Sequence, residues 1–312
     1  MTKINTLKVG IIGGGFGYYG HYKAFQEIDS CKVIAIATRK KISISKNVKI
    51  YSDPKKLITS ENLDIISVAT IPKNQQNLLL KLIKSSSKLF LEKPLGINYL
   101  VCKNRLSKIK DSKIAINFTF PEIDEFKYFK NKFVKKKDKN ISINWVFDNS
   151  ANKLNTWKND KKMGGGIIFN YFSHSLYYIE FLFGQIIKIN NIKKSKTIFN
   201  CEIFTKNEKK IIFRLNCNSK IKKRHEIIIN KKNPIKLFSN DPLRFNKFKI
   251  YIKNKIVPIR DYKKIHDSDS RYFYVAKLLK RYIKAINTNT SFRPDHLDGL
   301  KNLMWLNKIE KI

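Results

Sequence analysis

An apolar run that ends in a cluster of glycines constrains the fold of this chain more than any other feature. The run Lys8–Ile12 enters a glycine-rich stretch over residues 13–20, which is followed by a predicted helix over Tyr22–Ile28 and a second apolar run, Lys32–Thr38. A strand, a glycine turn, a helix and a parallel strand form the unit that binds a dinucleotide, because the turn admits the pyrophosphate and the helix N-terminus offers it N–H groups. An ordinary turn without a ligand is the alternative.

The glycine spacing departs in one place from the standard Gly-x-Gly-x-x-Gly pattern. Gly13 and Gly15 fit, but the third position holds Tyr18, with Gly17 and Gly20 on either side. One glycine serves the tight turn and the next allows the backbone to approach the pyrophosphate, so the pattern still predicts a cofactor site. Its candidate cofactor-binding residues are Gly13, Gly15, Phe16 and Gly17.

The end of the second apolar run bears on the choice of cofactor. An NAD-preferring site usually has an acidic residue there, which accepts hydrogen bonds from the ribose 2′-hydroxyl. This chain has Thr38 and Arg39, followed by two lysines. A guanidinium can bind a 2′-phosphate bidentately, so we expect NADP to be preferred over NAD, with Thr38 and Arg39 in the site. The alternative is a solvated basic turn.

Further apolar runs extend a doubly wound α/β pattern. Leu63–Pro72 predicts a buried parallel strand ending in a turn, Asn77–Lys84 predicts a helix, and Lys88–Gly96 predicts a strand closed by a charged pair and a proline. In open α/β sheets, ligands lie beyond the carboxyl ends of the strands. The candidate cofactor-binding residues at these ends are Thr70, Pro72, Glu92 and Lys93.

A triple glycine before a helix carries the second chemical signal. Gly164–Gly166 precede a predicted buried helix over Ile167–Phe183. Asn170 and His174 are four residues apart on this helix and therefore share a face. A histidine with an unperturbed pKa of roughly 6.5 can give or take a proton near neutrality, so His174 is a candidate acid/base. A hydrogen-bonded structural histidine is the alternative.

These motifs occur in the order and at the intervals of a known family. They are Gly13-x-Gly15 with His21, Asp64 through Pro72, Glu92-Lys93-Pro94, Gly164–Gly166 with Asn170 and His174, and Phe292-Arg293-Pro294 before a last helix. Over essentially its whole length, the chain resembles the glucose–fructose oxidoreductase and inositol dehydrogenase family (Gfo/Idh/MocA). The resemblance implies a nicotinamide dinucleotide, NADP or NAD, in an N-terminal Rossmann domain, and a substrate over a large, mainly antiparallel sheet.

The resemblance also implies roles for particular residues. The lysine that matches Lys93 lies near the nicotinamide and the reacting hydroxyl, and the histidine that matches His174 is the acid/base. Trp157 and Lys158 match a family position near the cofactor and the substrate. The alternative for Trp157 is a loop residue that covers the core.

The chain departs from the family at three positions near this chemistry. Many members have an Asp where this chain has Asn170, an Asp where it has Tyr177, and a His where it has Gln75. An amide cannot accept a proton at neutral pH, although it can orient one by hydrogen bonding. We therefore expect a mechanism that uses Lys93 and His174, with Asn170 holding the substrate hydroxyl or the imidazole tautomer, and Gln75 beside the cofactor.

The expected activity is hydride transfer between nicotinamide and the hydroxyl or carbonyl carbon of a sugar or nucleotide-sugar-like substrate. His174 would take the hydroxyl proton, and Lys93, as an ammonium, would stabilise the alkoxide. Asn170, Tyr177 and the altered glycine motif motivate an alternative, which is a non-catalytic dinucleotide-binding sensor or partner protein. The presence of both Lys93 and His174 favours the enzyme.

The net charge of +40 does not by itself indicate a nucleic-acid-binding protein. Only nine of the 64 basic residues are arginine, the residue such proteins commonly use against bases and phosphates. The four cysteines show no close pairing and no metal-type spacing with the histidines, so we expect no metal site. We expect a cytoplasmic protein without a signal peptide or a membrane span, because glycine or polar residues interrupt both long apolar stretches.

Two domains are expected, a dinucleotide-binding Rossmann domain over residues 1–120 and an α+β substrate and oligomerisation domain over residues 121–312. The final helix, over residues 294–310, is expected to pack back on the first domain. Alternation of apolar residues and lysines in the second domain predicts a mainly antiparallel sheet with one solvated face, followed by a helix over Arg271–Ile286. The predicted strands are Ile141–Phe147, Ile186–Ile192, Ile198–Phe204, Lys210–Asn216, Glu226–Asn230 and Phe248–Ile252. Family members often associate through the outer face of this sheet, so a homo-oligomer is expected, although its lysines oppose close pairing.

Overall fold

The structure, a computed structural model, describes residues 6–107, 109, 113–135, 139–148, 156–218, 223–230, 232–241, 244–259 and 270–312. The chain divides into two compact units. The first consists of Met1–Phe118, Lys162–Gly164 and Arg271–Asn307, and the second of Thr119–Lys161, Gly165–Ser270 and Lys308–Ile312. The sequence predicts one boundary, at residue 120. In the structure, the segment Arg271–Asn307 lies beyond that boundary but belongs to the first unit.

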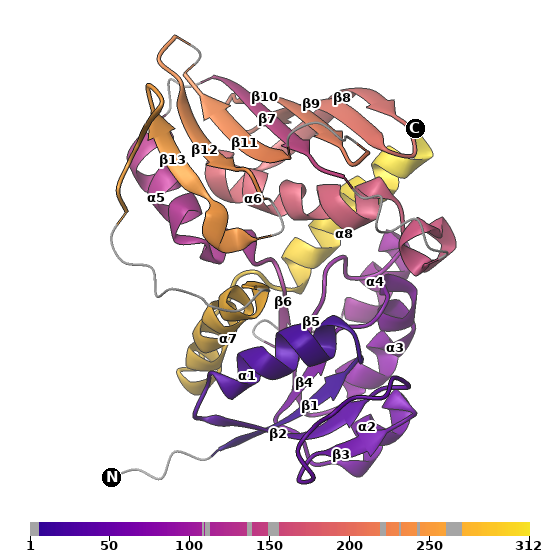
Figure 1. Ribbon diagram of the computed structural model, residues 1–312. Helices are drawn as coiled ribbons and strands as arrows, with labels where there is room; N and C mark the ends of the chain where they lie inside the picture. The colour runs from indigo at the N-terminus through magenta and orange to yellow at the C-terminus, as the bar shows by residue number, and fades with distance from the viewer. Residues whose placement is uncertain are drawn as a thin grey trace. The chain divides into compact units, whose positions relative to one another are not determined.

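The first unit is built on a six-stranded sheet in which every pair of neighbours is parallel (Figure 1). Its order is β3-β2-β1-β4-β5-β6, so the chain winds outward from β1 first to one side and then to the other. The strands are β1 (Leu7–Ile12), β2 (Cys31–Ala37), β3 (Lys49–Tyr51), β4 (Ile65–Val68), β5 (Lys88–Leu91) and β6 (Ile114–Ile116). The predicted doubly wound parallel sheet is confirmed.

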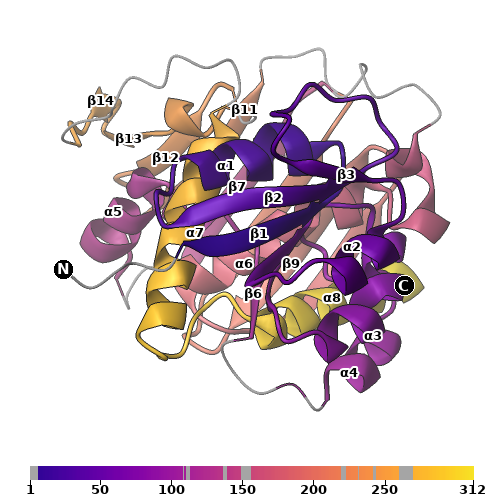
Figure 2. The ribbon, with the colours of Figure 1, turned by 90° about the horizontal axis from the view of Figure 1, so that it is seen from below.

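Helices cover both faces of this sheet (Figure 2). On one face, apolar residues of α1 (Lys23–Gln26) and α7 (Arg271–Asn287) form a core with alternate residues of the strands, such as Val9 and Ile11. On the other face, Gly10 lets Leu57 of α2 (Pro54–Ser60) approach β1. The remaining helices of the unit are the π-helical turn η1 (Gly17–Tyr22), α3 (Pro72–Lys84), α4 (Tyr99–Leu106) and α8 (His296–Lys311), of which α8 continues beyond Asn307 into the second unit.

The last helix starts with a reciprocal cap. Asp295 Oδ1 accepts the backbone N–H of Asp298 at 3.0 Å, and Asp298 Oδ2 accepts that of Asp295 at 3.1 Å. These bonds satisfy N–H groups that the first turn of a helix leaves without a helical acceptor. Further along α8, Asn307 bonds the backbone of Ile97 and Tyr99, which attaches this helix to other parts of the first unit.

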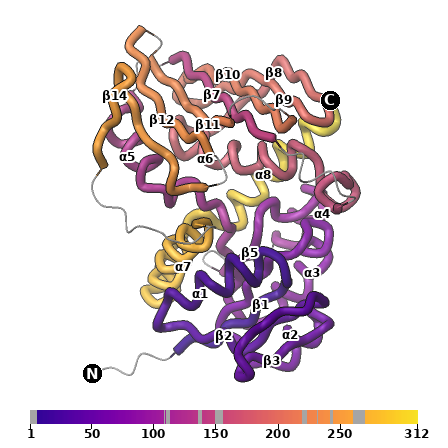
Figure 3. The backbone as a smooth tube through the Cα atoms, in the orientation of Figure 1, coloured from indigo at the N-terminus to yellow at the C-terminus, as the bar shows by residue number. Residues whose placement is uncertain are grey.

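The second unit is built on an eight-stranded sheet of order β14-β13-β12-β11-β7-β10-β9-β8. Its neighbours are antiparallel except for β7 and β10, so the predicted mainly antiparallel sheet is confirmed. Figure 3 traces the chain through these strands. They are β7 (Asn140–Val146), β8 (Ile186–Lys194), β9 (Ile198–Thr205), β10 (Lys210–Asn216), β11 (Arg224–Ile229), β12 (Ile235–Ser239), β13 (Lys249–Ile252) and β14 (Lys255–Ile256).

One face of this second sheet is covered by helices with aromatic side chains. Phe172 packs against Phe199 and Phe213 of the sheet, with ring centroids 4.6 and 4.8 Å apart. The covering elements are η2 (Phe120–Glu122), α5 (Asp124–Phe133), the π-helical turn η6 (Ile168–Phe172) and α6 (Ser173–Phe183). Short turns η4 (Trp157–Asn159), η5 (Lys161–Met163) and η7 (Phe245–Lys247) complete the described elements of this part of the chain. Among the helices that the structure describes, none has the length and apolar content needed to cross a bilayer.

Candidate active site

The glycine turn starts where β1 ends, and Gly13 is required there by both conformation and space. Its φ is +129°, and an added Cβ would lie 2.1 Å from the carbonyl oxygen of Ala69, which follows β4. Residues with a side chain rarely adopt this conformation. Gly13 N–H donates to Ala37 O at 2.9 Å, and Ala69 N–H donates to Ile12 O at 2.8 Å, so the turn joins the ends of β1, β2 and β4.

Gly15 and Gly17 have opposite environments. A Cβ on Gly15 would meet no heavy atom within 4 Å, apart from its own chain neighbours, so the turn is open there. This opening fits a dinucleotide, whose pyrophosphate must approach the backbone closely. A Cβ on Gly17 would lie 3.3 and 3.5 Å from Ile11 and Ala69. Gly17 therefore gives the close packing of helix on strand that the third glycine usually gives, which accounts for Tyr18 in the sequence pattern.

The end of β2 lies directly at this turn. Thr38 is almost buried, and its Oγ1 accepts the backbone N–H of Lys40 at 2.9 Å. A Cβ on Gly14 would lie 1.9 Å from the same oxygen. Arg39 and Lys40, by contrast, are exposed. Arg39 and Lys40, which the sequence predicts to favour NADP, thus directly follow the end of β2, and this strand end packs against the glycine turn.

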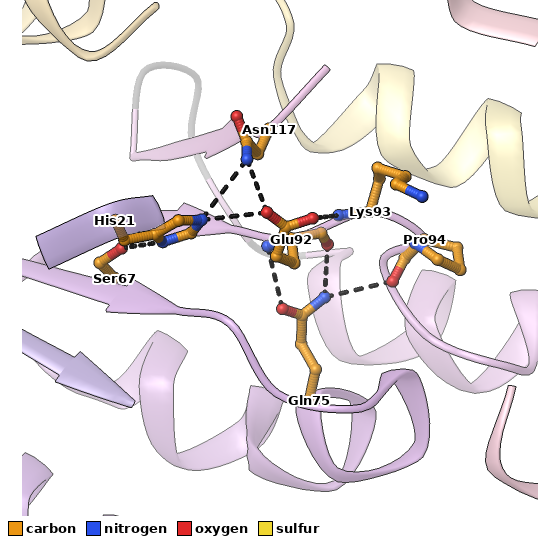
Figure 4. A network of polar contacts seen from close by, with 7 residues as sticks. All are labelled: His21, Ser67, Gln75, Glu92, Lys93, Pro94 and Asn117. Atoms are coloured by element: carbon orange, nitrogen blue, oxygen red, sulfur yellow. Dashed lines mark hydrogen bonds and ion pairs between the residues drawn. The ribbon is translucent and has the colours of Figure 1, made fainter. Parts of the chain in front are cut away.

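A buried polar network lies beside the turn, with His21 at its centre (Figure 4). His21 Nδ1 lies 2.7 Å from Oγ of Ser67 on β4, and Nε2 lies 3.0 Å from Oε1 of Glu92, which follows β5. Asn117 Nδ2, after β6, donates to the same carboxylate oxygen at 2.6 Å. Because a carboxylate only accepts hydrogen bonds, His21 Nε2 carries a proton and donates it to Glu92. Ser67 is fully buried, which excludes it as a nucleophile for external substrates.

Glu92 connects this network to Lys93. Its Oε2 accepts the backbone N–H of Lys93 at 3.1 Å. Burial raises the pKa of Glu92, but the hydrogen bond and charge of His21, the charge of Lys93 and the Asn117 amide outweigh burial and hold this pKa below its ordinary value. Glu92 is therefore a carboxylate that fixes the Lys93 backbone at the carboxyl end of β5.

Gln75 supports the same turn from beneath. It is fully buried, and its Nε2 donates to the carbonyls of Glu92 at 2.7 Å and Pro94 at 3.3 Å. Its Oε1 accepts the Glu92 N–H at 3.1 Å. The predicted contact of Gln75 with the cofactor stays a prediction; what the structure describes is an amide bonded to the backbone on both sides of Lys93.

The other predicted strand-end residues surround the start of α3. Thr70 is half-buried between β4 and α3, and Pro72 is buried as the first residue of α3. A Cβ on Gly164 would lie 2.6 Å from Pro72 and 2.9 Å from Ile97, and the φ of Gly164 is +90°. A residue with a side chain at position 164 would therefore clash with Pro72 and Ile97, so this glycine serves packing within the protein.

The second and third of these glycines belong to the other unit and pack against the turn η4. A Cβ on Gly165 would lie 2.3 Å from the carbonyl oxygen of Trp157. Gly166 N–H donates to Lys158 O at 2.7 Å, and Asn170 Nδ2 donates to the same oxygen at 2.9 Å. Trp157 and Lys158, predicted near the cofactor and the substrate, lie in a turn that Asn170 anchors, with Trp157 half-buried and Lys158 exposed.

The π-helical start of this helix leads into α6 with Asn170 and His174 on one half-buried face. Tyr177 belongs to the same face, whereas the residues between them are mostly buried. The His174 ring lies against Phe120 at 5.4 Å and Trp145 at 6.4 Å between centroids. His174 therefore rests on an aromatic cluster without being enclosed in the core, which suits a proton carrier. The predicted role of Asn170 towards substrate or imidazole stays a prediction.

Sequence reasoning missed a second histidine in that aromatic cluster. His225 on β11 is fully buried, stacks on Trp145 at 4.4 Å between ring centroids, and its Nε2 lies 2.9 Å from Oη of Tyr178. Burial lowers the pKa of His225 to about 3, so it is neutral at physiological pH. The alternation of β11 gave the only signal for it, because His225 occupies an inward position of a strand.

Ser67 and Asn117 were also missed, and for Asn117 a signal existed. It directly follows β6 at a strand carboxyl end, where the rule that selected Glu92 and Lys93 applies equally. Within the part of the chain that the structure describes, no three His, Cys, Asp or Glu side chains are grouped as metal ligands. Lys93 belongs to the first unit and Asn170 and His174 to the second, so their convergence on one site stays a prediction.

The comparisons with known proteins agree with this geometry. Residues 7–116 match the model of the oxidoreductase family with an NAD-binding Rossmann fold, named GFO_IDH_MocA. Over these residues the chain is similar to the Gfo/Idh/MocA oxidoreductase family. A curated relative, an uncharacterized oxidoreductase from Synechocystis sp., is 24% identical over 197 residues, which is 59% of this chain and 53% of that protein. The aligned part thus spans about half the length of the curated relative.

Solved structures share the fold over almost the whole chain. A levoglucosan dehydrogenase in complex with NADH and levoglucosan has a TM-score of 0.82 at 14% identity, over 98% of this chain and 96% of that one. An oxidoreductase domain protein from Kribbella flavida has a TM-score of 0.80 at 14% identity, over 98% and 97%. The WlbA dehydrogenase from Bordetella pertussis, in complex with NADH and UDP-GlcNAcA, has a TM-score of 0.73 at 13% identity, over 98% and 95%. At these identities the likeness concerns the fold.

Proposed function

We propose that this Gfo/Idh/MocA protein is an NAD(P)-dependent dehydrogenase or reductase that acts on a CH–OH group, or the corresponding carbonyl, of a sugar or nucleotide-sugar-like substrate. The observation that carries the proposal is the Lys93 turn. His21, Glu92 and Gln75 fix its backbone beyond β5, in the same sheet whose glycine turn is open at Gly15. A buried network of this kind is more than a solvated lysine at a strand end requires.

The residues of this chain supply position and proton transfer. When bound, a nicotinamide supplies the two-electron acceptor or donor. In the oxidation direction, His174 accepts the substrate hydroxyl proton, and Lys93 as an ammonium stabilises the oxygen on which negative charge develops. In the reducing direction, the same histidine returns the proton to the carbonyl oxygen. The anchored amide of Asn170 makes it a positioning residue for the turn that carries Trp157 and Lys158.

The sugar-like substrate is supported by related folds. The levoglucosan dehydrogenase and WlbA structures contain a sugar and a nucleotide sugar respectively, each with NADH. The positive charge of this chain would favour an anionic member of that class, such as a nucleotide sugar. We also propose a cytoplasmic setting, which the reduced cysteines suit, and a homo-oligomer formed through the outer face of the second sheet.

Turnover of a substrate panel tests the activity. The purified protein is mixed with NADP⁺ or NAD⁺ and with levoglucosan, inositols and UDP-sugars, and reduced nicotinamide is followed by absorbance. Turnover of at least one member supports the proposal. Binding of the dinucleotide without turnover of any panel member would instead favour the second candidate, a non-catalytic dinucleotide-binding sensor, which Asn170 and Tyr177 motivate.

The choice of cofactor is proposed to be NADP over NAD, through Arg39 and with help from Lys40. Both side chains are exposed beyond β2, where they can pair with a 2′-phosphate. Titration of NADPH and NADH by nicotinamide fluorescence, with wild type and Arg39→Ala, should show weaker NADPH binding in the variant and little change for NADH. Equal affinities for NADPH and NADH, unaltered by Arg39→Ala, would contradict the proposed preference for NADP.

A further inference from the structure

Arg271, the first residue of α7, lies over the aromatic side chains that follow the glycine turn. Its guanidinium carbon is 5.1 Å from the ring centroid of Phe16 and 5.8 Å from that of Tyr19. Arg271 is about 250 residues away from the turn in sequence and lies outside residues 7–116, which match the family model. All three residues nevertheless belong to the first compact unit.

The platform under this guanidinium is held firmly. The Phe16 ring contacts the rings of Tyr19 and His21 edge-on, at 5.3 and 5.4 Å between centroids. On its other side Gly20 leaves just enough room, because a Cβ there would lie 2.5 Å from Phe16. Since these contacts restrict the Phe16 ring, the guanidinium that lies over it is restrained as well.

The opening at Gly15 lies immediately before Phe16 in the chain. A guanidinium that lies over an aromatic ring keeps a planar set of N–H donors, which match the paired oxygens of a phosphate. We infer that Arg271 is a phosphate-binding residue of the dinucleotide site, contributed by the C-terminal part of the chain. The ligand group it takes is the diphosphate that joins the two nucleotides. This inference rests on the dinucleotide binding proposed above.

A structural alternative makes a different prediction. If Arg271 only holds Phe16 in place, its replacement should alter the turn without adding a salt-sensitive loss of affinity. Arg281 provides a matched control, because it lies on the same helix and its guanidinium carbon is 5.3 Å above the ring centroid of Phe292. It differs from Arg271 in the partners described for it, which are Phe292 and the carbonyl of Arg293 rather than residues of the glycine turn.

The test is calorimetric titration of the full-length protein with ADP-ribose, which carries the diphosphate without nicotinamide. Arg271→Gln is expected to weaken ADP-ribose binding about 10- to 100-fold at low salt, the range for a charge-assisted hydrogen bond, and less at high salt. Arg271→Lys should lose less, because it keeps the charge without the planar fork. Arg281→Gln should bind within about twofold of wild type, as expected for a surface change away from the ligand.

Two results would overturn the assignment while leaving dinucleotide binding intact. One is a wild-type affinity in both Arg271 variants. The other is a loss that is the same at low and high salt, which would show that Arg271 acts through the shape of the turn. Failure of wild type to bind ADP-ribose, NADH and NADPH would contradict the proposed function itself. Thermal unfolding of each variant, measured alongside, separates a lost ligand contact from lost folding.

Discussion

The glycines of the first turn differ in what each position requires of the residue. Gly13 needs a positive φ and lies against the Ala69 carbonyl, Gly17 allows η1 to pack on β1, and Gly15 borders open space. The same residue type thus serves conformation, packing and ligand access within five positions. Alanine substitutions distinguish these requirements. An added methyl group should lower the stability of the fold at one position and the affinity for a ligand at another.

The first prediction compares Gly13→Ala with Gly15→Ala. Gly13→Ala should destabilise the protein by about 2 kcal/mol or more, since it strains the backbone and presses on a carbonyl. Gly15→Ala should change the free energy of unfolding by less than about 1 kcal/mol but weaken NADPH binding roughly 5- to 100-fold, because its methyl group occupies ligand space. Urea unfolding and fluorescence titration check the two effects. A stable Gly15→Ala protein with unaltered affinity would show that the dinucleotide does not pass over this turn.

Two amides, the buried Gln75 and the half-buried Asn170, show how a residue can belong to a site by holding the backbone around it. Gln75 bonds the backbone on both sides of Lys93, and Asn170 bonds the Lys158 carbonyl. An aspartate at position 170 could partner an imidazolium but could not donate to that carbonyl. Asn170→Asp therefore exchanges one interaction for another, and its effect on turnover reports which of the two matters more.

At the scale of elements, β11 carries the group whose titration the fold most clearly controls. His225 is enclosed between the sheet and the helices that cover it, stacked on Trp145 and bonded to Tyr178. Burial lowers its pKa from the ordinary 6.5 to about 3. In the unfolded chain His225 therefore binds a proton near pH 6.5, whereas in the folded chain it binds one only near pH 3. Stability is fully present above pH 6.5 and falls as the pH drops towards 3.

The second prediction concerns this pH dependence. Between pH 7 and pH 5 wild type should lose about 2 kcal/mol of unfolding free energy through His225. His225→Phe keeps an aromatic ring in the stack and removes the proton site. The variant also leaves the Tyr178 hydroxyl without its acceptor, and this loss should lower the free energy of unfolding equally at both pH values. Urea unfolding at the two pH values measures the difference. Identical losses in wild type and variant would mean that His225 titrates normally.

At the scale of the whole molecule, the two compact units divide the proposed chemistry between them. Lys93 and the dinucleotide turn belong to the first unit, and His174 belongs to the second. If both side chains act on one substrate oxygen, the reaction loses most of its catalytic help when either is removed. Their effects on turnover should then be strongly non-additive.

The third prediction uses that non-additivity. His174→Ala alone should lower kcat about 10²- to 10⁴-fold, the range for losing acid–base help, and leave NADPH binding nearly unaltered. Lys93→Met combined with His174→Ala should lie within about tenfold of the worse single variant. Steady-state kinetics with the best substrate of the panel measures all three. A double variant whose loss equals the product of the single losses would show that the two groups act independently, and intact turnover in His174→Ala would remove it as the base.

Much of the fold followed from local pattern. The strands β1, β2, β4 and β5 of the first unit are apolar runs, and β10 was predicted over the residues it occupies, because its inward and outward residues alternate strictly. The strands β3, β12 and β14 and the helices α2 and α4 were not predicted. They are short, and β14 is only two residues long, so the pairing of these strands depends on neighbouring strands rather than on their own periodicity.

The sequence by itself determined the resemblance to the family, the glycine turn and the strand ends at which Glu92 and Lys93 stand, because these depend on spacing along the chain. Only the tertiary structure decided what surrounds them. His21 and Asn117 meet at Glu92, and Ser67 bonds His21 from β4. The helix α7 brings Arg271 over Phe16 from the far end of the chain. No local pattern encodes such contacts, since burial and hydrogen bonding are settled between segments that the chain brings together only on folding.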